Sequence, residues 1–285
     1  MKKLTEILKQ YKNEEWLFIK IPFISIFLLF IAKTILLSKP ANYPLGLCKL
    51  IDCNVFLFKP VAIIILFVAI IFSILYLFEK VMLLSLTILF ITSLLVFTIS
   101  DSTGIFARTD VLTMVLFAQL IAYIYAYFSE KGKTYLYKNR IQFPIQVIAA
   151  GYTLSALSKL FNSGILWSFN YKGLAIQAKK AIGYKYLFDG SEVLLQKMET
   201  FPNFIISHPA LIISILTLSV LFELFAGIAV FKKKYAFYWG LLLLCMHLGI
   251  YFFMNVMILP VIISMTAFFI NPLYILYKYL TNSEK

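Results

Sequence analysis

The sequence is dominated by uninterrupted apolar blocks, each about as long as the roughly 20 residues that a helix needs to cross a bilayer. No water bonds to backbone amides inside the hydrocarbon, so such blocks must form helices or a closed barrel. Apolar residues make up 62% of the chain and charged residues only 14%, whereas soluble domains are about half apolar and about a quarter charged. A cytosolic enzyme, a disordered chain and a disulfide-dense secreted scaffold are therefore excluded. We predict an all-α, polytopic bundle of transmembrane helices.

These blocks predict about eight spans in a single membrane domain over residues 1–285. Residues 235–276 are nearly continuous, and only Asn255 and Pro260 interrupt them, so seven spans are also possible. The eight predicted spans are Leu17–Leu37, Pro60–Phe78, Val81–Ser100, Val111–Phe128, Ile141–Leu160, Pro209–Phe231, Tyr235–Phe253 and Val256–Leu276.

The distribution of basic residues predicts the orientation of the chain. The lysine-rich residues 1–16 are expected in the cytoplasm, and alternation of eight spans brings the C-terminus to the same side. No small-residue cleavage site follows the first block, so we expect it to remain as a span. Cytoplasmic loops thus explain much of the net charge of +13 without a nucleic-acid partner. Residue usage rich in Lys, Ile and Phe is typical of AT-rich bacterial genomes, so the expected location is the bacterial inner membrane.

Two predicted outer segments are too long to be simple turns. Residues 38–59 contain Cys48 and Cys53, which form either a structural disulfide or two free thiols. Residues 161–208 alternate apolar and basic residues, which favours short helices that lie on lipid headgroups. With 3 Cys and 2 His in the chain, we expect no Cys/His metal site.

Glu223 lies well inside a predicted span, where an ionisable residue is costly and is a candidate for function. Ser219, Glu223 and Gly227 are spaced i, i+4, i+8, so a continuous helix would place them on one face and let a neighbouring helix approach. The alternative is a buried structural carboxylate that is tied to a neighbouring Tyr or Lys.

His247 is in the middle of another predicted span, on a stripe with Gly240, Tyr251 and Asn255. This polar stripe indicates a functional histidine. The alternative is a hydrogen-bonded packing residue, which is the usual role of a single His on an apolar helix.

Three lysines fall within predicted spans. Lys159 shares a helix face with Tyr152 and Ser155, and it is either a base shielded from water or a lysine whose head reaches the interface. For Lys20 and Lys33, near the ends of the first span, we expect the charged head to reach the interface.

Three motifs occur in an order that resembles the HTTM (horizontally transferred transmembrane) domain family. This family is related to the membrane domain of the vitamin K-dependent gamma-glutamyl carboxylases. Lys159 in Y-T-L-S-A-L-S-K-L resembles their aromatic-x-x-x-G/A-x-x-K-L segment. Glu223 in F-E-L-F-A-G-I-A-V-F resembles the acidic-x-x-x-G-x-x-x-F helix, and His247 in C-M-H-L-G-I-Y-F-F resembles the helix that follows. The resemblance covers residues 142–270.

The resemblance implies a membrane bundle that holds a reduced quinone, either vitamin K hydroquinone or menaquinol. It implies Lys159 as the base and His247 as the residue that orients the quinone, in an oxygenation, epoxidation or carboxylation reaction. The other implied quinone contacts are Tyr152, Ser155, Glu223 and Tyr251.

Two other classes of function compete with this enzyme. One is a non-catalytic membrane partner whose outer segment, residues 161–208, binds an exported protein. The other is a small transporter, which the lack of an internal repeat disfavours. Expected partners of an enzyme are membrane lipid and an exported peptide or a redox protein.

Overall fold

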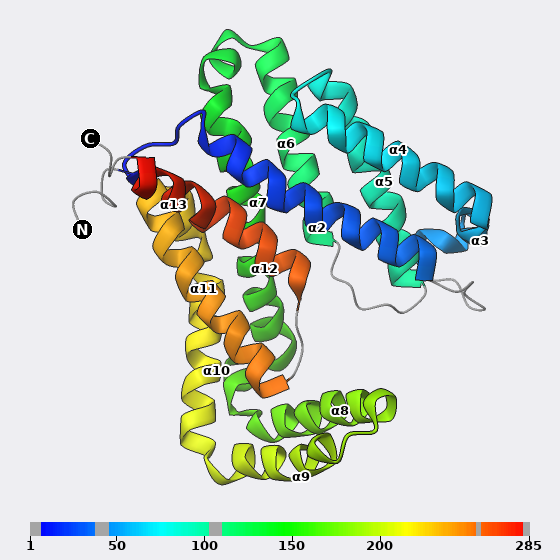
Figure 1. Ribbon diagram of the computed structural model, residues 1–285. Coiled ribbons are helices and arrows are strands. Elements are labelled where there is room, and N and C mark those ends of the chain that lie inside the picture. Colours follow the sequence, from blue (N-terminus) through cyan, green and yellow to red (C-terminus); the bar gives the residue numbers. More distant parts are fainter. Residues whose placement is uncertain (1–6, 38–45, 103–109, 255–257, 282–285) are drawn as a thin grey trace.

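The chain folds into a bundle of helices (Figure 1). The computed structural model describes residues 7–37, 46–102, 110–254 and 258–281, and every regular element within these ranges is helical. Six helical stretches are long and apolar enough to cross a membrane, so the chain is a multi-pass membrane protein, as predicted. They are α2 (Glu15–Leu37), α4 (Lys59–Leu77), α5 (Met82–Ser102), α6 (Asp110–Phe128), α11 (Lys233–Met254) and a broken stretch of α12 (Leu259–Met265), η4 (Thr266–Ile270) and α13 (Pro272–Thr281).

The two remaining predicted spans differ from simple apolar helices. Residues 141–160 lie within α7 (Glu130–Ser163), which is not among the six stretches. Residues 209–231 form α10 (Pro209–Leu224) and the 3₁₀ segment η3 (Ala226–Val230). With 16 residues, α10 is shorter than a bilayer crossing requires. It passes the same test only together with α9 (Glu192–Ser207), from which it is bent by 87°. Among the described residues, length and composition therefore identify six spans, or seven with this pair, and the predicted number of about eight is not confirmed.

The 34-residue helix α7 is central to the packing. It contacts α6 on one side and α10 and η3 on the other. Figure 1 shows it running from the turn after α6 to the hairpin formed by α8 (Tyr171–Asp189) and α9. Because its rise is about 1.5 Å per residue, α7 is about 50 Å long. It therefore connects two ends of the molecule.

One end of the bundle is closed by ion pairs between segments that are distant in the sequence. Lys233 at the start of α11 pairs with Glu15 at the start of α2. Lys278 Nζ of α13 lies 2.6 Å from Glu14 Oε2. Both described ends of the chain thus lie together, and we call this region, defined by these four residues, the terminal end.

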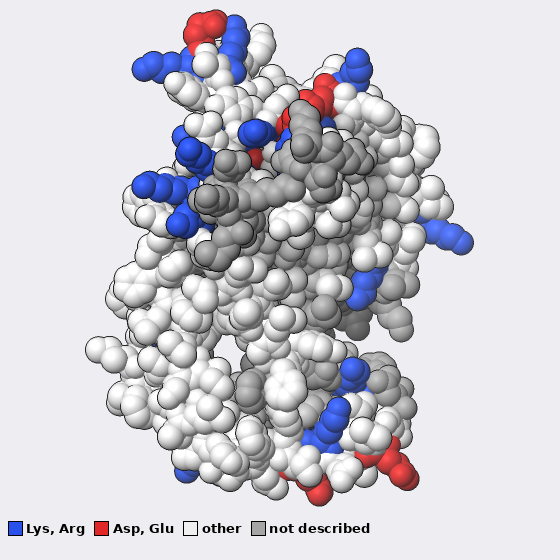
Figure 2. Space-filling view, turned by 60° about the vertical axis from the view of Figure 1, so that its left-hand side comes forward, with Lys and Arg blue, Asp and Glu red and all other residues white. Residues whose placement is uncertain are grey.

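The predicted outer segment 161–208 contains α8 and α9, which pack against each other as a hairpin. Gly190 ends α8 with φ 61°, a left-handed conformation that glycine adopts without strain. Ala175 and Ala178 of α8 and Ile205 of α9 form a small buried core with Ile212 of α10. In Figure 2 charged side chains gather toward the top and bottom of the molecule, and a broad uncharged band separates them on the left.

Near the terminal end, a charge network joins α2, α7 and the turn between α4 and α5. Lys20 of α2 is 2% exposed, and its Nζ donates to Glu79 Oε1 at 2.9 Å and to the carbonyl of Leu77 at 2.8 Å. Arg140 of α7 is also buried and donates to Glu79 Oε2 at 3.3 Å. The ammonium of Lys20 thus reaches the turn between two spans, as expected of a lysine near the end of a span, but it is paired within the protein there. Lys33 is exposed.

The network makes stability depend on pH. Burial raises the pKa of the Glu79 carboxyl, but the hydrogen bond and charge of Lys20, with the charge of Arg140, outweigh it and hold the pKa below its ordinary value. Ionised Glu79 therefore stabilises the fold above its unfolded pKa of about 4.3, and this contribution is lost as the pH falls through the lower folded value.

We expect the melting temperature in detergent to fall more steeply below about pH 4.3 in the wild type than in Glu79→Gln, which lacks the titrating group. Glu199→Gln, at an exposed position of α9, is the matched control and should keep the wild-type slope. Equal slopes in wild type and Glu79→Gln would contradict the stabilising role of this carboxylate.

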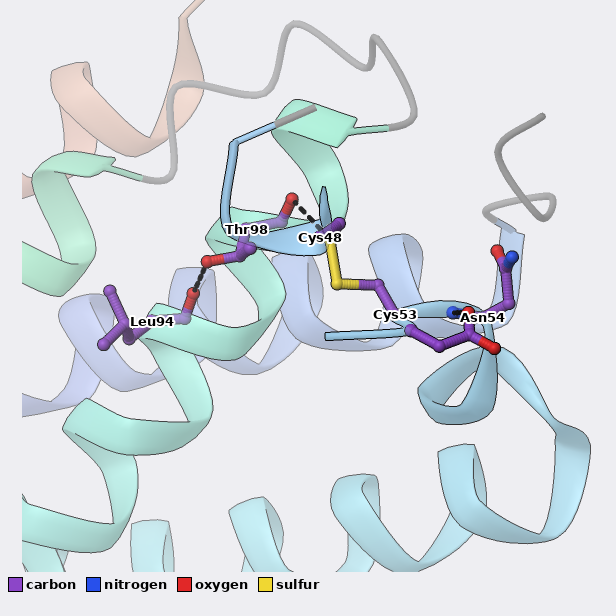
Figure 3. The surroundings of a disulfide bond; sticks show 6 residues. Cys48, Cys53, Asn54, Leu94 and Thr98 are labelled. Carbon is purple, nitrogen blue, oxygen red and sulfur yellow. Dashed lines mark hydrogen bonds between the residues drawn. A yellow bond between two sulfur atoms is a disulfide. The ribbon is translucent and has the colours of Figure 1, made fainter. Parts of the chain in front are cut away.

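Cys48 and Cys53 form a disulfide bond, which decides between the two predicted states (Figure 3). The bond ties η1 (Gly46–Lys49) to the residue before α3 (Asn54–Leu57). Cys48 Sγ lies 3.6 Å from the carbonyl of Thr98 near the end of α5, which is a contact because a disulfide sulfur carries no hydrogen. Both cysteines pack against Ile99. The disulfide thus attaches the first interhelical segment to α5.

Replacing both cysteines, Cys48→Ser with Cys53→Ser, should lower the free energy of unfolding by about 2 kcal/mol, because the unfolded chain regains the entropy of a short open loop. Thermal or denaturant unfolding in detergent measures this loss. Cys245→Ser, which changes the exposed free thiol, should leave stability unchanged. Equal stability of the double variant and the wild type would refute a structural role for the bond.

Candidate functional site

An ion pair between α7 and α10 joins two of the predicted candidates. Lys159 Nζ donates to Glu223 Oε2. Glu223 is 4% exposed, whereas the side chain of Lys159 is 26% exposed and its Nζ lies 5.1 Å from the centre of the Trp167 ring. A buried carboxylate needs such a partner, because removing an isolated charge from water costs several kcal/mol. Glu223 is thus tied to a lysine, as the alternative of a buried structural carboxylate expected.

A second polar pair lies on the same face of α7. Tyr152 precedes Lys159 by seven residues, which is two helical turns. Its hydroxyl lies 2.5 Å from His247 Nε2 of α11 and 3.5 Å from Met265 Sδ of α12. His247 is 5% exposed, so this hydrogen bond is shielded from solvent.

The two pairs form one group, which we call the intramembrane cluster: Tyr152, Lys159, Glu223 and His247. Tyr152 and Lys159, two turns apart on α7, belong one to each pair and so connect the two. Three helices, α7, α10 and α11, supply these side chains. An ammonium, a carboxylate, a phenol and an imidazole can together donate, accept and store protons in a region of low dielectric.

Glu223 lies where the helix changes its form. After α10 ends at Leu224, the backbone continues as η3, and carbonyl groups lose their regular helical partners. Side chains of neighbouring helices replace these partners. Trp239 Nε1 donates to the carbonyl of Phe222 at 3.0 Å, Thr153 Oγ1 lies 3.4 Å from that of Leu224, and Gln142 Nε2 donates to that of Val230 at 3.1 Å.

Sequence reasoning missed these supporting residues. In the sequence, these residues are visible only as polar side chains within apolar stretches of α7 and α11. Their partners are backbone carbonyl groups, which a regular helix would not leave free. The predicted face of Ser219, Glu223 and Gly227 is also wrong beyond Glu223, because the 3₁₀ segment changes the period. Gly227 is exposed, and a Cβ there would meet open space.

A close helix approach occurs instead at Gly240 of α11, where a Cβ would lie 2.7 Å from Cβ of Phe269. Two predicted quinone contacts, Ser155 and Tyr251, are exposed, and the contacts described place neither in the cluster. Asn255 lies outside the described residues.

The ion pair predicts a strong asymmetry between single and double substitutions. Lys159→Met leaves Glu223 buried without its cation and should lower the free energy of unfolding by about 3–5 kcal/mol. Lys159→Met with Glu223→Leu removes both charges and should recover most of that loss. Unfolding in detergent measures the cycle.

Lys138→Met, at an exposed position of the same helix, is the control and should cost less than about 0.5 kcal/mol. A double variant that is no more stable than Lys159→Met would show that the two charges are not coupled.

No family model, curated protein or solved structure matches this chain.

Proposed function

We propose that this chain is a membrane enzyme that acts on a reduced quinone, such as vitamin K hydroquinone or menaquinol, with Lys159 as its base. The observation that carries the proposal is the intramembrane cluster, in which the three residues singled out by the HTTM resemblance, Lys159, Glu223 and His247, come together with Tyr152. The reaction class that fits best is quinone-dependent oxygenation or epoxidation, with carboxylation of an exported peptide as a possible coupled step.

The donor set of the cluster fits the polar groups of a hydroquinone ring. Tyr152 and His247 offer a hydroxyl and an imidazole, which can hydrogen-bond a ring oxygen once they separate from each other. When bound, a hydroquinone supplies a redox-active ring that reacts with oxygen after loss of a hydroxyl proton.

Lys159 and Glu223 can prepare the base. Transfer of one proton from Lys159 Nζ to Glu223 Oε2 converts the ion pair into a neutral amine and a neutral carboxylic acid. The amine lone pair can then accept a proton from a bound hydroxyl group, and the exposed part of Lys159 allows access to it.

The orientation that we propose places the terminal end in the cytoplasm, in a bacterial inner membrane. The Cys48–Cys53 disulfide supports it, because disulfides persist in oxidising compartments, and the bond lies between the first two spans. The hairpin α8–α9 would then face the outer side. Its exposed Ile176 and Leu187, beside exposed lysines of α8, suit a surface that rests on headgroups.

Purified protein in nanodiscs, given menaquinol or vitamin K hydroquinone with oxygen, should produce quinone epoxide that mass spectrometry detects. We expect Lys159→Met with Glu223→Leu to lose activity at least about 100-fold, because a general base contributes about that much or more. This pair of substitutions keeps the buried charges balanced, so the loss would not reflect unfolding. Lys138→Ala should keep wild-type activity.

An epoxide yield equal to that without protein, or full activity of the double variant, would reject the enzyme.

A non-catalytic partner protein is the second candidate, and the hairpin is the observation that favours it. Its two helices contribute exposed apolar side chains beyond the small core that they share with α10. Such a protein would co-purify an exported protein or a redox protein in a way that depends on residues 161–208 and not on Lys159. Ile176→Ser with Leu187→Ser should abolish that co-purification and leave any epoxide formation intact.

A further inference from the structure

A depression of about 620 Å³ opens at the terminal end, between α7 and the segment that precedes α2. Four of its lining residues come from α7 at positions i, i+3, i+4 and i+7, so they share one helix face. The lining residues are Lys133, Leu136, Tyr137 and Arg140 of α7, with Lys12, Asn13 and Glu14.

Arg140 is the buried member of this lining, with 4% exposure. Its Nη1 donates to Glu79 Oε2 at 3.3 Å and lies 3.4 Å from the Tyr123 hydroxyl, and its Nη2 donates to Asn13 Oδ1. The guanidinium also lies 4.8 Å from the ring centre of Trp16. These contacts hold the group in one orientation. Among the described residues, its Nε has no acceptor.

The charge of the lining is positive. Lys12 and Lys133 are exposed, and the lining contains one acidic residue, Glu14, while the charge of Arg140 is paired with Glu79 outside the lining. Glu14 is already paired with Lys278 of α13 at 2.6 Å. Lys133 reaches Glu130 at 2.8 Å, but both side chains are largely exposed, and surface pairs of this kind contribute little. An anion in the depression would therefore meet a net positive site.

A second depression, of about 590 Å³, adjoins the first and shares Asn13 and Glu14 with it. Most of its other lining residues are apolar, including Leu17, Leu77 and Phe78. Leu17 and Phe78 are 50% and 72% exposed. A basic pocket thus continues into an apolar surface at the end of two membrane-spanning helices, α2 and α4.

We propose that the first depression binds the phosphate group of an anionic phospholipid and that the second receives part of its acyl chain. Lysine binds phosphate oxygens as a point charge, and Lys12 and Lys133 supply two such groups, while Arg140, whose donors contact Glu79 and Asn13, positions Asn13 beside them. A free phosphate ion would bind in the same way, but it has no apolar part that could occupy the second depression. The lipid is therefore the source that the two depressions favour together. Arg140 lies about 28 Å from Lys159 along α7, so the phosphate site is separate from the intramembrane cluster.

Binding of short-chain phosphatidylglycerol, phosphatidylcholine and inorganic phosphate to the full chain in detergent tests this site, for example by native mass spectrometry. Phosphatidylglycerol should bind at least about tenfold more tightly than the other two. Lys12→Gln with Lys133→Gln should weaken that binding by about tenfold or more, because each lysine near an anionic headgroup contributes to affinity. Lys131→Gln with Lys138→Gln removes the same charge from exposed positions of α7 outside the depression. It should change binding less than about twofold.

Three results would overturn the proposal. Equal binding of phosphatidylglycerol and phosphatidylcholine would remove the preference for an anionic lipid. Equal binding of inorganic phosphate would assign the site to a free ion. An equal loss in both double variants would show that only the overall positive charge attracts the lipid.

Discussion

A buried charge or a buried, free backbone carbonyl must find a partner within the protein, and the structure depends on this constraint. Lys20 pairs with Glu79, Lys159 with Glu223, and Lys233 with Glu15. Each pair joins segments that are far apart in the sequence. Because loss of one partner can leave a buried charge uncompensated, each pair favours the arrangement of helices that brings its two segments together.

The same constraint explains why the candidate site lies beside an irregular helix. The transition from α10 to η3 frees carbonyl groups, and Trp239 and Thr153 bond to two of them from α11 and α7. Glu223 lies between the two residues whose carbonyls are bonded in this way. Neighbouring helices therefore hold the backbone on both sides of Glu223, and Lys159 holds its carboxylate.

The apolar blocks predicted the all-α class and six of the spans, because hydrophobic length alone determines them. The predicted spans within α7 and α10 are not confirmed: α7 is not among the six stretches, and α10, with 16 residues, passes the test only together with α9, from which it bends at His208. Polarity within a predicted span singled out Glu223, His247 and Lys159, and each of them contacts a polar side chain of another helix. Their pairing could not be predicted, because it depends on how each helix is rotated about its axis. The partner of Lys20 could not be predicted for a related reason, since Glu79 lies in a turn 59 residues away.

Solid-state NMR on protein in lipid bilayers, with ¹⁵N at the lysine Nζ and ¹³C at the glutamate carboxyl carbons, tests the central claim most directly. A strong dipolar cross-peak between Lys159 Nζ and the carboxyl carbon of Glu223 is predicted, and it should disappear in Glu223→Gln. A Lys159 signal with no such cross-peak and with contacts to bulk water would contradict the intramembrane pair and the proposals that rest on it.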